Sequence, residues 1–529
     1  MSVSRMLVGE APQTRGAYVL RYLDRLPEAE VLQMLQAAGV ADPAGAVRTA
    51  DSLQHGIGTS SVSSDLSEFD ACTVQTQPTD LLHRRRRARL AGAAVLGGLV
   101  AATVIVAAQN GSSQSAPPER PVSVRSAPAL APRDLVRTPS QVWADTSRVD
   151  FTAWPSRGDR THDEALLGRA LKSWSQPVRG DENLSATPGT STAPPLAPPH
   201  LLYAGAVDAR KVVLLYDGLR LARYTEPVGS DAQAAALSLA RVDDADVTTA
   251  AAVVLADGDA TARYLLAPWI AEAGRRDLLH PDTAAHELDV SEDGVTEAVP
   301  VTTPGATCER RTVLQLRSSS RIVEDHSFLL ADLGGLSPVH LTYTPLPARG
   351  GSPARQPREA TGSAALLAWS RLACDTGVHH GLSREAVRAV NLWDFADQRL
   401  PQGGGEVVWS CTRAVTWRGS SEVSVRLRTD GTDPARVVAR AGDTAACSRF
   451  GQHVVACARW LSPKGDWYVL AAGSRAVTSL TVTGGVTARS DGRTLAVRAS
   501  KDAQAEATGH LATGDDVPAV PTAADLGRP

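Results

Sequence analysis

The hydrophobic residues of positions 1–57 recur with the period of an α-helix in three short stretches. Pro27 and Pro43 stand at the start of the second and third stretches, and Gly39 stands at the end of the second. Proline is favoured in the first turn of a helix, and glycine just past its end. We therefore predict an all-α mini-domain with a small core over residues 1–57, followed by a flexible polar linker over residues 58–83.

A run without any charged residue covers positions 90–108. At about 1.5 Å per residue, a helix of this length reaches roughly 28 Å, close to the hydrocarbon thickness of a bilayer. We predict one transmembrane helix, in a segment 84–108 that includes its basic flank. That flank consists of Arg84, Arg85, Arg86, Arg87 and Arg89. Because positive residues stay on the cytoplasmic side, we expect a cell-membrane protein with its N-terminus in the cytoplasm and its C-terminus outside.

Two further hypotheses concern the same run. A cleaved leader would also place basic residues before an apolar stretch, but 83 residues precede Arg84, so we expect an uncleaved anchor. Ala93, Gly97 and Ala101 follow one another at intervals of four. This spacing allows two helices to pack closely and form a weak homodimer, although a run rich in alanine and glycine also produces it by chance.

Beyond the run, the pattern first indicates linkers and then strands. Residues 109–160 are rich in proline and serine and predict a stalk. Residues 161–199 predict a short helix and a proline-rich linker, with Thr161 and Glu164 in the pattern of a capping box. Further along, short apolar runs are separated by Asp-Gly pairs. The pairs at Asp217 and Asp491 predict the turns of two hairpins.

The fold class predicted from this pattern is mainly β (α+β), with an extracytoplasmic region of two β-rich modules and short helices. The first module covers residues 200–345 and the second residues 405–512. A linker at 346–362 and a helical connector at 363–404 separate them, and residues 513–529 are predicted to be a disordered tail. The two modules show similar successions of elements, which a degenerate duplication and coincidence explain equally well.

Composition excludes one large class of partners. The 529 residues carry a formal net charge of −3, and residues 1–83 contain five arginines against ten acidic residues. Because DNA and RNA are bound through a positive surface, we expect no nucleic acid partner. All ten tryptophans follow the predicted span, so we expect the large cores outside the cytoplasm.

Five of the six cysteines also follow the predicted span, where disulfides can persist. The preferred pairs are Cys308–Cys374 and Cys411–Cys447, with Cys457 as a buried thiol. Pairing of Cys457 with Cys411 or with Cys447 stays open, because connectivity does not follow from sequence. No CxxC spacing occurs, which argues against structural zinc.

The common motifs of catalysis and cofactor binding are absent: GxSxG, a Walker A loop, HExxH, and GxGxxG after a strand. Residues 289–300 begin like a calcium loop, but Pro300 stands where the loop needs glutamate, so we predict a turn. His379 and His380 are adjacent and would point to opposite faces of a strand. We therefore predict no cofactor, no metal and no identifiable catalytic residue.

These patterns favour a binding or sensing protein over an enzyme. We expect the outside region to recognise an unknown envelope ligand or protein, and the helical segment to contact a cytoplasmic protein. The alternatives are a structural component of the envelope and an envelope hydrolase. A small helical cytoplasmic domain on a single-pass anchor resembles membrane-bound anti-sigma factors in architecture, which implies a regulatory role. The HxxxCxxC zinc motif of many such factors is absent, because His55, Cys72 and His83 lack ligand spacing.

Overall fold

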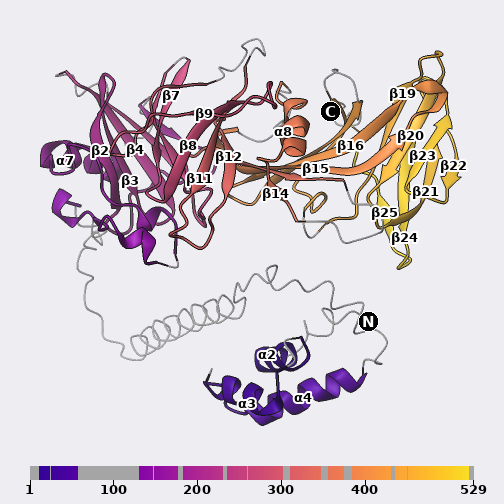
Figure 1. Cartoon of the computed structure of the whole chain (residues 1–529), viewed down its shortest axis with the longest axis horizontal. Coiled ribbons are helices and arrows are strands. Elements are labelled where there is room, and N and C mark those ends of the chain that lie inside the picture. The colour runs from indigo at the N-terminus through magenta and orange to yellow at the C-terminus, as the bar shows by residue number, and fades with distance from the viewer. Residues whose placement is uncertain are drawn as a thin grey trace, which may run out of the picture. The chain divides into compact units, whose positions relative to one another are not determined.

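The computed structural model of the chain divides into two compact units, residues 1–124 and residues 125–529 (Figure 1). The structure describes residues 11–23, 26–37, 39–56, 130–146, 148–176, 183–229, 235–258, 260–301, 310–346, 356–374, 384–429, 435–448 and 451–522.

The first unit is a small bundle of helices. Its elements are α2 (Pro12–Tyr18), the π-helical turn η1 (Val19–Leu23), α3 (Glu28–Ala37) and α4 (Pro43–Gly56). The core is formed by Ala17, Tyr18, Val31, Leu35, Ala46, Val47 and Ala50. Nε of Arg21 lies 2.7 Å from Oδ1 of Asp51, which joins η1 to α4. All three predicted helical stretches are therefore helices, and their apolar faces meet in one core.

Among the described residues, no helix is both long and apolar enough to cross a membrane. The span predicted at residues 90–108 lies outside the described residues, and so do the five flanking arginines at 84–87 and 89 and the small residues of the dimer hypothesis. The structure therefore leaves these three predictions untested.

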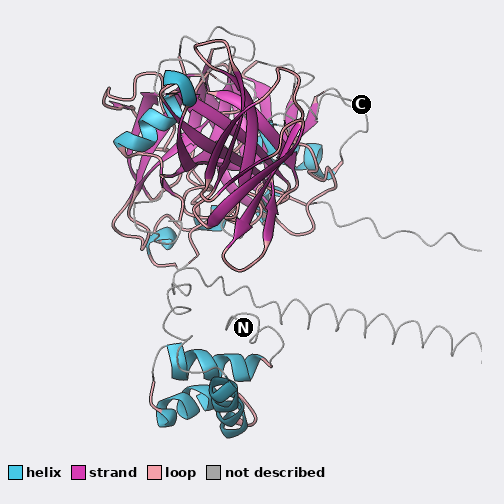
Figure 2. Cartoon of the chain, turned by 90° about the vertical axis from the view of Figure 1, so that its right-hand side faces the viewer, coloured by secondary structure: helices cyan, strands magenta, loops and turns pink. Residues whose placement is uncertain are grey.

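The second unit is mostly β (Figure 2). Its first sheet has the order β1 (Leu184–Ala186), β5 (Ala236–Arg241), β4 (Arg220–Pro227), β3 (Arg210–Tyr216) and β2 (His200–Val207). Helix α7 (Glu164–Ser175) covers one face of this sheet, with Leu167, Leu171 and Trp174 in the shared core. Asp163 caps the helix by accepting the N–H of Leu166 at 2.9 Å, in place of the predicted Thr161.

The other face of the first sheet packs on a second, smaller sheet. The second sheet has the order β10 (Val299–Pro300), β7 (Thr261–Leu266) and β6 (Ala252–Asp257). Val253 and Leu265 face the first sheet, and Val254 and Leu266 face strands further along the chain. The alternation of each strand thus places apolar side chains in two cores at once.

A ten-stranded sheet runs through the middle of the unit. Its order is β18 (Arg436–Gly442), β17 (Ser421–Thr429), β16 (Glu406–Thr416), β15 (Val387–Arg399), β13 (Val339–Thr344), β12 (Ser327–Ala331), β11 (Thr312–Ser318), β8 (Ile270–Asp277) and β9 (His286–Glu287), and β14 (Arg358–Glu359) pairs with β13. Strands β13 and β15 are parallel, and the other neighbours are antiparallel.

This sheet differs from the predicted division into two modules with a helical connector. Among the described residues between 363 and 404, the helical elements are α8 (Ser363–Ser370) and the short 3-10 turns η9 (Arg384–Ala386) and η10 (Pro401–Gly403). Strand β15 lies between the two turns. Through β15, the strands of the two predicted modules belong to one sheet. Helix α8 packs on it with Leu366 and Trp369, next to Leu341.

Two small sheets complete the unit. One has the order β19 (Val455–Leu461), β20 (Trp467–Gly473) and β23 (Thr494–Arg498), and the other β22 (Ala488–Ser490), β21 (Val477–Gly484), β24 (Ala505–Leu511) and β25 (Asp516–Pro518). One face of β19 and β20 packs on β15 to β18, and the opposite face packs on β21 and β24. Three layers of strands therefore lie at the C-terminal end of the unit (Figure 1).

Two predictions about this end are wrong. The turn at Asp491 and Gly492 does not close a hairpin, because β22 before it pairs with β21, and β23 after it pairs with β20. Part of the stretch 513–529 is structured instead of disordered. Strand β25 pairs with β24, and Thr522 forms an antiparallel bridge with Ala439.

Candidate functional site

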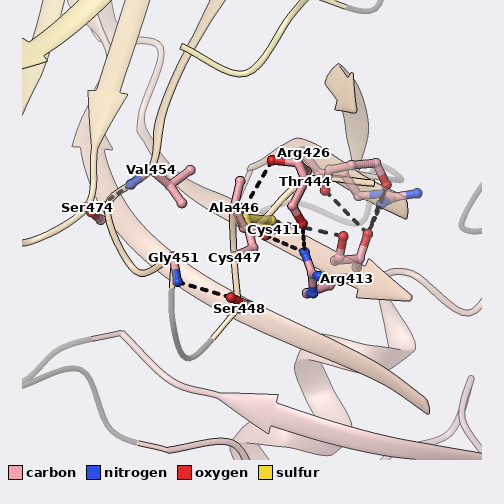
Figure 3. Close-up of a disulfide and its surroundings, with 12 residues drawn as sticks. Cys411, Arg413, Arg426, Thr444, Ala446, Cys447, Ser448, Gly451, Val454 and Ser474 are labelled. Carbon is pink, nitrogen blue, oxygen red and sulfur yellow. Dashed lines mark hydrogen bonds between the residues drawn. A yellow bond between two sulfur atoms is a disulfide. The ribbon is translucent and has the colours of Figure 1, made fainter. Parts of the chain in front are cut away.

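A disulfide joins β16 to the connection between β18 and β19 (Figure 3). Cys411 lies on β16, Cys447 lies in the connection, and both are buried. The predicted pair Cys411–Cys447 is confirmed, and the alternatives that pair either residue with Cys457 are wrong. The thiol of Cys457 donates to the carbonyl oxygen of Ala505 at 3.5 Å. Cys374 is also disulfide-bonded, and its predicted partner at position 308 lies outside the described residues.

Polar contacts hold the same connection at further points. From β16, Nη1 of Arg413 donates to the carbonyl oxygens of Thr444 at 2.5 Å and Ala446 at 2.8 Å. Burial lowers the pKa of Arg413. Just before β19, the N–H of Val454 donates to the hydroxyl of Ser474 at 3.1 Å (Figure 3). The disulfide and these bonds fix where the chain leaves β18 and where it enters β19.

Between these strands lies a cavity of about 580 Å³, which we name the interlayer groove. It is lined by Arg436, Val437 and Val438 of β18, Cys457, Ala458 and Arg459 of β19, Val469 of β20, Gly484 at the end of β21, residues 502–506 before and in β24, and Thr522. This volume is in the range of small-ligand and peptide sites. The groove is thus built by all three layers of strands.

An extended segment of the chain occupies one end of the space between β18 and β19. The N–H of Val520 donates to the carbonyl oxygen of Val455 at 2.9 Å, and the N–H of Arg440 donates to the carbonyl oxygen of Pro521 at 3.0 Å. Thr522, which follows, lines the groove. A single segment therefore uses backbone groups of both strands.

The charged side chains of the groove are balanced. Arg436 and Arg459 contribute positive charge, and Asp502 and Glu506 contribute negative charge. Nη1 of Arg459 donates to the carbonyl oxygen of Lys501 at 2.7 Å. With no excess of either sign, the groove is not built to concentrate an anion or a cation. Beside the charged residues it is lined by small and apolar ones such as Ala458, Ala503 and Val469.

A second cavity, of about 640 Å³, lies among loops near β3, β5 and β11. We name it the acidic cavity, and its charged lining residues are Arg148, Asp150, Asp243, Asp244, Asp246 and Glu324. Most of these carboxylates already have partners inside the protein. Nε of Arg148 lies 2.5 Å from Asp150. Arg241 forms two hydrogen bonds of 2.5 Å with Asp243, and these bonds lower the pKa of Asp243.

Asp246 serves the structure of its own loop. Burial acts to raise its pKa, but hydrogen bonds from the N–H and hydroxyl of Thr249 and the charge of Arg388 outweigh burial, and the pKa is lowered. Nη2 of Arg388 lies 3.1 Å from its carboxylate. Because these contacts already stabilise the charged form, we do not regard the acidic cavity as a cation site.

A polar chain continues from Asp246 to two histidines. The hydroxyl of Thr248 donates to Asp246 at 2.9 Å and lies 3.4 Å from Nδ1 of His340. Nε2 of His340 lies 2.8 Å from Glu359, and Nε2 of His326 lies 3.5 Å from the other oxygen of the same carboxylate. The order of hydroxyl, imidazole and carboxylate resembles a hydrolytic triad. Thr248, however, is buried and already donates to Asp246, so it is not an available nucleophile.

Within the described ranges, no three His, Cys, Asp or Glu side chains are grouped so that they could hold a metal ion. The turn predicted at the start of the calcium-like loop is confirmed, because the N–H of Gly294 donates to the carbonyl oxygen of Ser291 at 2.8 Å. Asp293 accepts the N–H of Gly158 at 3.0 Å. The adjacent histidines His379 and His380 lie outside the described residues.

No protein-family model matches the chain, and no curated protein matches its sequence.

Apart from Cys457, the groove residues were not singled out by the sequence patterns. Cys457 was predicted to be buried, which is confirmed, but nothing in its strand indicates a neighbouring cavity. Arg436 and Val437 belong to a strand whose edge is exposed only because β18 is the outermost strand of its sheet. An edge is a property of strand order, so no local pattern could have revealed it.

Proposed function

We propose that the chain is a single-pass membrane protein whose β-rich unit lies outside the cytoplasm and works as a binding or sensing module, coupled to the cytoplasmic helical unit. The proposal combines the apolar run 90–108 and its arginines with the disulfides of the second unit. The unit is proposed to be non-enzymatic, with an envelope ligand or protein as its partner.

The observation that carries the proposal is the Cys411–Cys447 disulfide, together with the disulfide-bonded state of Cys374. Structural disulfides persist in oxidising compartments and are rare in the cytoplasm of most organisms. The first described residue of the β-rich unit follows the apolar run in sequence, so this unit is the part that the anchor would place outside.

The interlayer groove supports a binding role. It is a cavity of suitable size in a rigid position, because the disulfide and Arg413 hold the connection between its two strands. The described residues contain two rows of hydroxyl, imidazole and carboxylate, and neither lines the groove. One is Thr248, His340 and Glu359, in which the hydroxyl already donates to Asp246. The other lies on β21, β24 and β25, where the hydroxyl of Thr481 lies 2.8 Å from Nε2 of His510, and Nδ1 of His510 lies 2.6 Å from Asp516. Binding without catalysis therefore agrees best with the groups present.

Topology is tested with two reporters fused after Pro529 of the full chain. Alkaline phosphatase folds only outside the cytoplasm, and we expect this fusion to be active. A green fluorescent protein that fluoresces only in the cytoplasm is expected to stay dark when it is exported unfolded. Replacing the five arginines at 84–87 and 89 by glutamine should weaken the orientation, whereas replacing Arg133, Arg137 and Arg148 should not. An inactive phosphatase fusion together with a fluorescent green fluorescent protein fusion would overturn the proposal.

Coupling is tested by photo-crosslinking in cells. Met34 on α3 is 49% exposed and apolar, which suits a contact with another protein. A crosslinking amino acid at position 34 of the full chain should capture one cytoplasmic protein reproducibly. The same amino acid at Ser52, on the exposed side of α4, is the matched control. Identical products at both positions would argue against a specific cytoplasmic partner.

A further inference from the structure

Two strand edges face the interlayer groove. β18 is the outermost strand of the ten-stranded sheet, and β19 is the outermost strand of its own sheet. Residues 436–438 and 457–459 of these strands line the cavity. The edge of a strand carries N–H and C=O groups that its sheet does not use, and an added strand can bind to them. The groove therefore offers backbone hydrogen bonds to one ligand from two sides.

A segment of the chain itself lies between β18 and β19 at one end of the groove. This segment, 519–522, is extended and bonds to Val455 of β19 and to Arg440 of β18. Ala439 and Thr522 form an antiparallel bridge. The same two strands continue into the groove as residues 457–459 and 436–438. An extended backbone therefore already fits at one end, and the continuing edges provide the same kind of contact.

The walls leave room for a backbone and small side chains. Ala458 and Ala503 are buried residues of the lining, and Gly484 lines it without a side chain. Arg436 is exposed at the edge of β18. Opposite charges on directly paired positions of two strands attract each other. A carboxylate on the added strand would therefore be favoured where it faces Arg436.

We propose that the interlayer groove binds an extended peptide segment of a partner protein as an added strand along β18, with small side chains toward Ala458 and Ala503 and a carboxylate facing Arg436. This inference rests on the proposed binding function and names its ligand class. Recognition through the backbone suits a partner with an exposed strand or an extended terminus.

The probe is a fluorescein-labelled peptide of the sequence Thr-Ala-Val-Asp-Val-Ala-Thr, titrated into the purified full chain in detergent micelles. We expect saturable binding. We also expect slower hydrogen exchange of edge amides among residues 436–438 and 457–459, since an added strand shields them. A peptide with the same sequence but with alternate backbone amides methylated should bind at least about tenfold more weakly, because it has lost its donors.

The side-chain contact is tested by charge reversal. Arg436→Glu should weaken binding of the acidic peptide about fivefold, and a peptide with lysine in place of aspartate should regain it. Arg489→Glu is the matched control, because Arg489 is an exposed arginine on β22 that does not line the groove. Both variants change an exposed side chain, so both are expected to fold.

The outcomes separate the candidate occupants. Binding to the full chain with edge protection supports a partner peptide. Binding only after truncation behind Thr522 would mean that the chain's own residues 523–529 compete for the groove, and would overturn the proposal. Equal binding of the methylated peptide, or no binding to either chain, would also overturn it. The proposed topology is measured separately by the reporter fusions, so a negative titration would leave that result intact.

Discussion

Arg428 and Asp394 form an ion pair inside the ten-stranded sheet, with 2.7 Å between Nη2 and Oδ2 and with side chains only 6% and 3% exposed. The hydroxyls of Tyr343 and Ser410 donate to the same carboxylate at 2.8 and 2.7 Å. Burial is the main reason that the pKa of Tyr343 is raised, so it stays a neutral donor. The carboxylate thus joins β13, β15, β16 and β17 in one buried polar cluster.

Removing the carboxylate of Asp394 should lower the stability of the β-rich unit. Asp394→Ala leaves the guanidinium of Arg428 buried without its ion partner, and we expect the free energy of unfolding to fall by about 3–5 kcal/mol. Chemical denaturation of the full chain measures it. Asp397→Ala on the same strand is the control, since its side chain is 64% exposed, and a change within about 0.5 kcal/mol is expected. Similar losses in both variants would contradict the assignment.

Loss of the Cys411–Cys447 disulfide should destabilise the unit without abolishing its strands. The bond closes a loop between residues separated by 36 positions. Loop-closure entropy predicts a loss of about 3–4 kcal/mol for the double variant Cys411→Ala/Cys447→Ala. Cys457→Ala removes a buried thiol without breaking a disulfide and should cost about 1 kcal/mol. Thermal unfolding followed by circular dichroism compares them, and equal shifts of the melting temperature would contradict this view.

Glu226 should make stability depend on acid pH. Arg169 donates two hydrogen bonds to its carboxylate at 2.8 and 2.7 Å, Lys211 lies at 3.0 Å and the hydroxyl of Tyr224 at 2.9 Å. The hydrogen bonds from Arg169 are the largest cause of a lowered pKa, from 4.5 to about 2. A depressed pKa contributes stability above the unfolded value, and this contribution is lost as pH falls through the folded value.

The expected window therefore lies between pH 4.5 and about 2. Above it, the shift corresponds to about 3 kcal/mol of stability for this nearly buried carboxylate. Glu226→Gln should be less stable than the native chain at neutral pH, and the difference should shrink as the pH falls through the window. Denaturation at a series of pH values measures both. Glu272→Gln, with a side chain 71% exposed, should follow the native profile throughout.

The two predicted modules should unfold together. Strand β15 pairs with β13 on one side and with β16 on the other, so it joins the strands of both modules in one sheet. Calorimetry of the full chain should show one cooperative transition for the β-rich unit. Val390→Asp places a charge in the core between β15 and α8, and should lower that whole transition. Two separate transitions, only one of them shifted, would favour independent modules.

Local chemistry explains the elements that were predicted correctly. The first helical stretches carry proline and glycine at their boundaries, and the hairpin of β3 and β4 turns at Asp217 and Gly218, where Gly218 has a φ of +92° that glycine adopts without strain. The same dipeptide at Asp491 turns the chain from one sheet to another. The dipeptide determines a turn, and the partners of the flanking strands determine whether the turn closes a hairpin.

Strand β15 was missed because its buried positions are not all apolar. Asp394 and Gln398 are buried on it, so its alternation of polar and apolar residues looks interrupted. Each finds partners from distant strands: Asp394 pairs with Arg428, and Gln398 accepts from Trp409 and donates to Leu495. A polar residue can be read as buried only when those partners are known.

By itself, the sequence determined the positions of most turns and helix ends and the alternation of most strands, because these depend on residues near one another. The pairing of Cys411 with Cys447 was one of several that the sequence allowed, and the tertiary structure decided it. Only the tertiary structure decided which strands became edges and which cavity lies between them. The interlayer groove exists because β18 and β19 end their sheets side by side. Strand order is set by the burial of whole faces, to which every strand contributes at once.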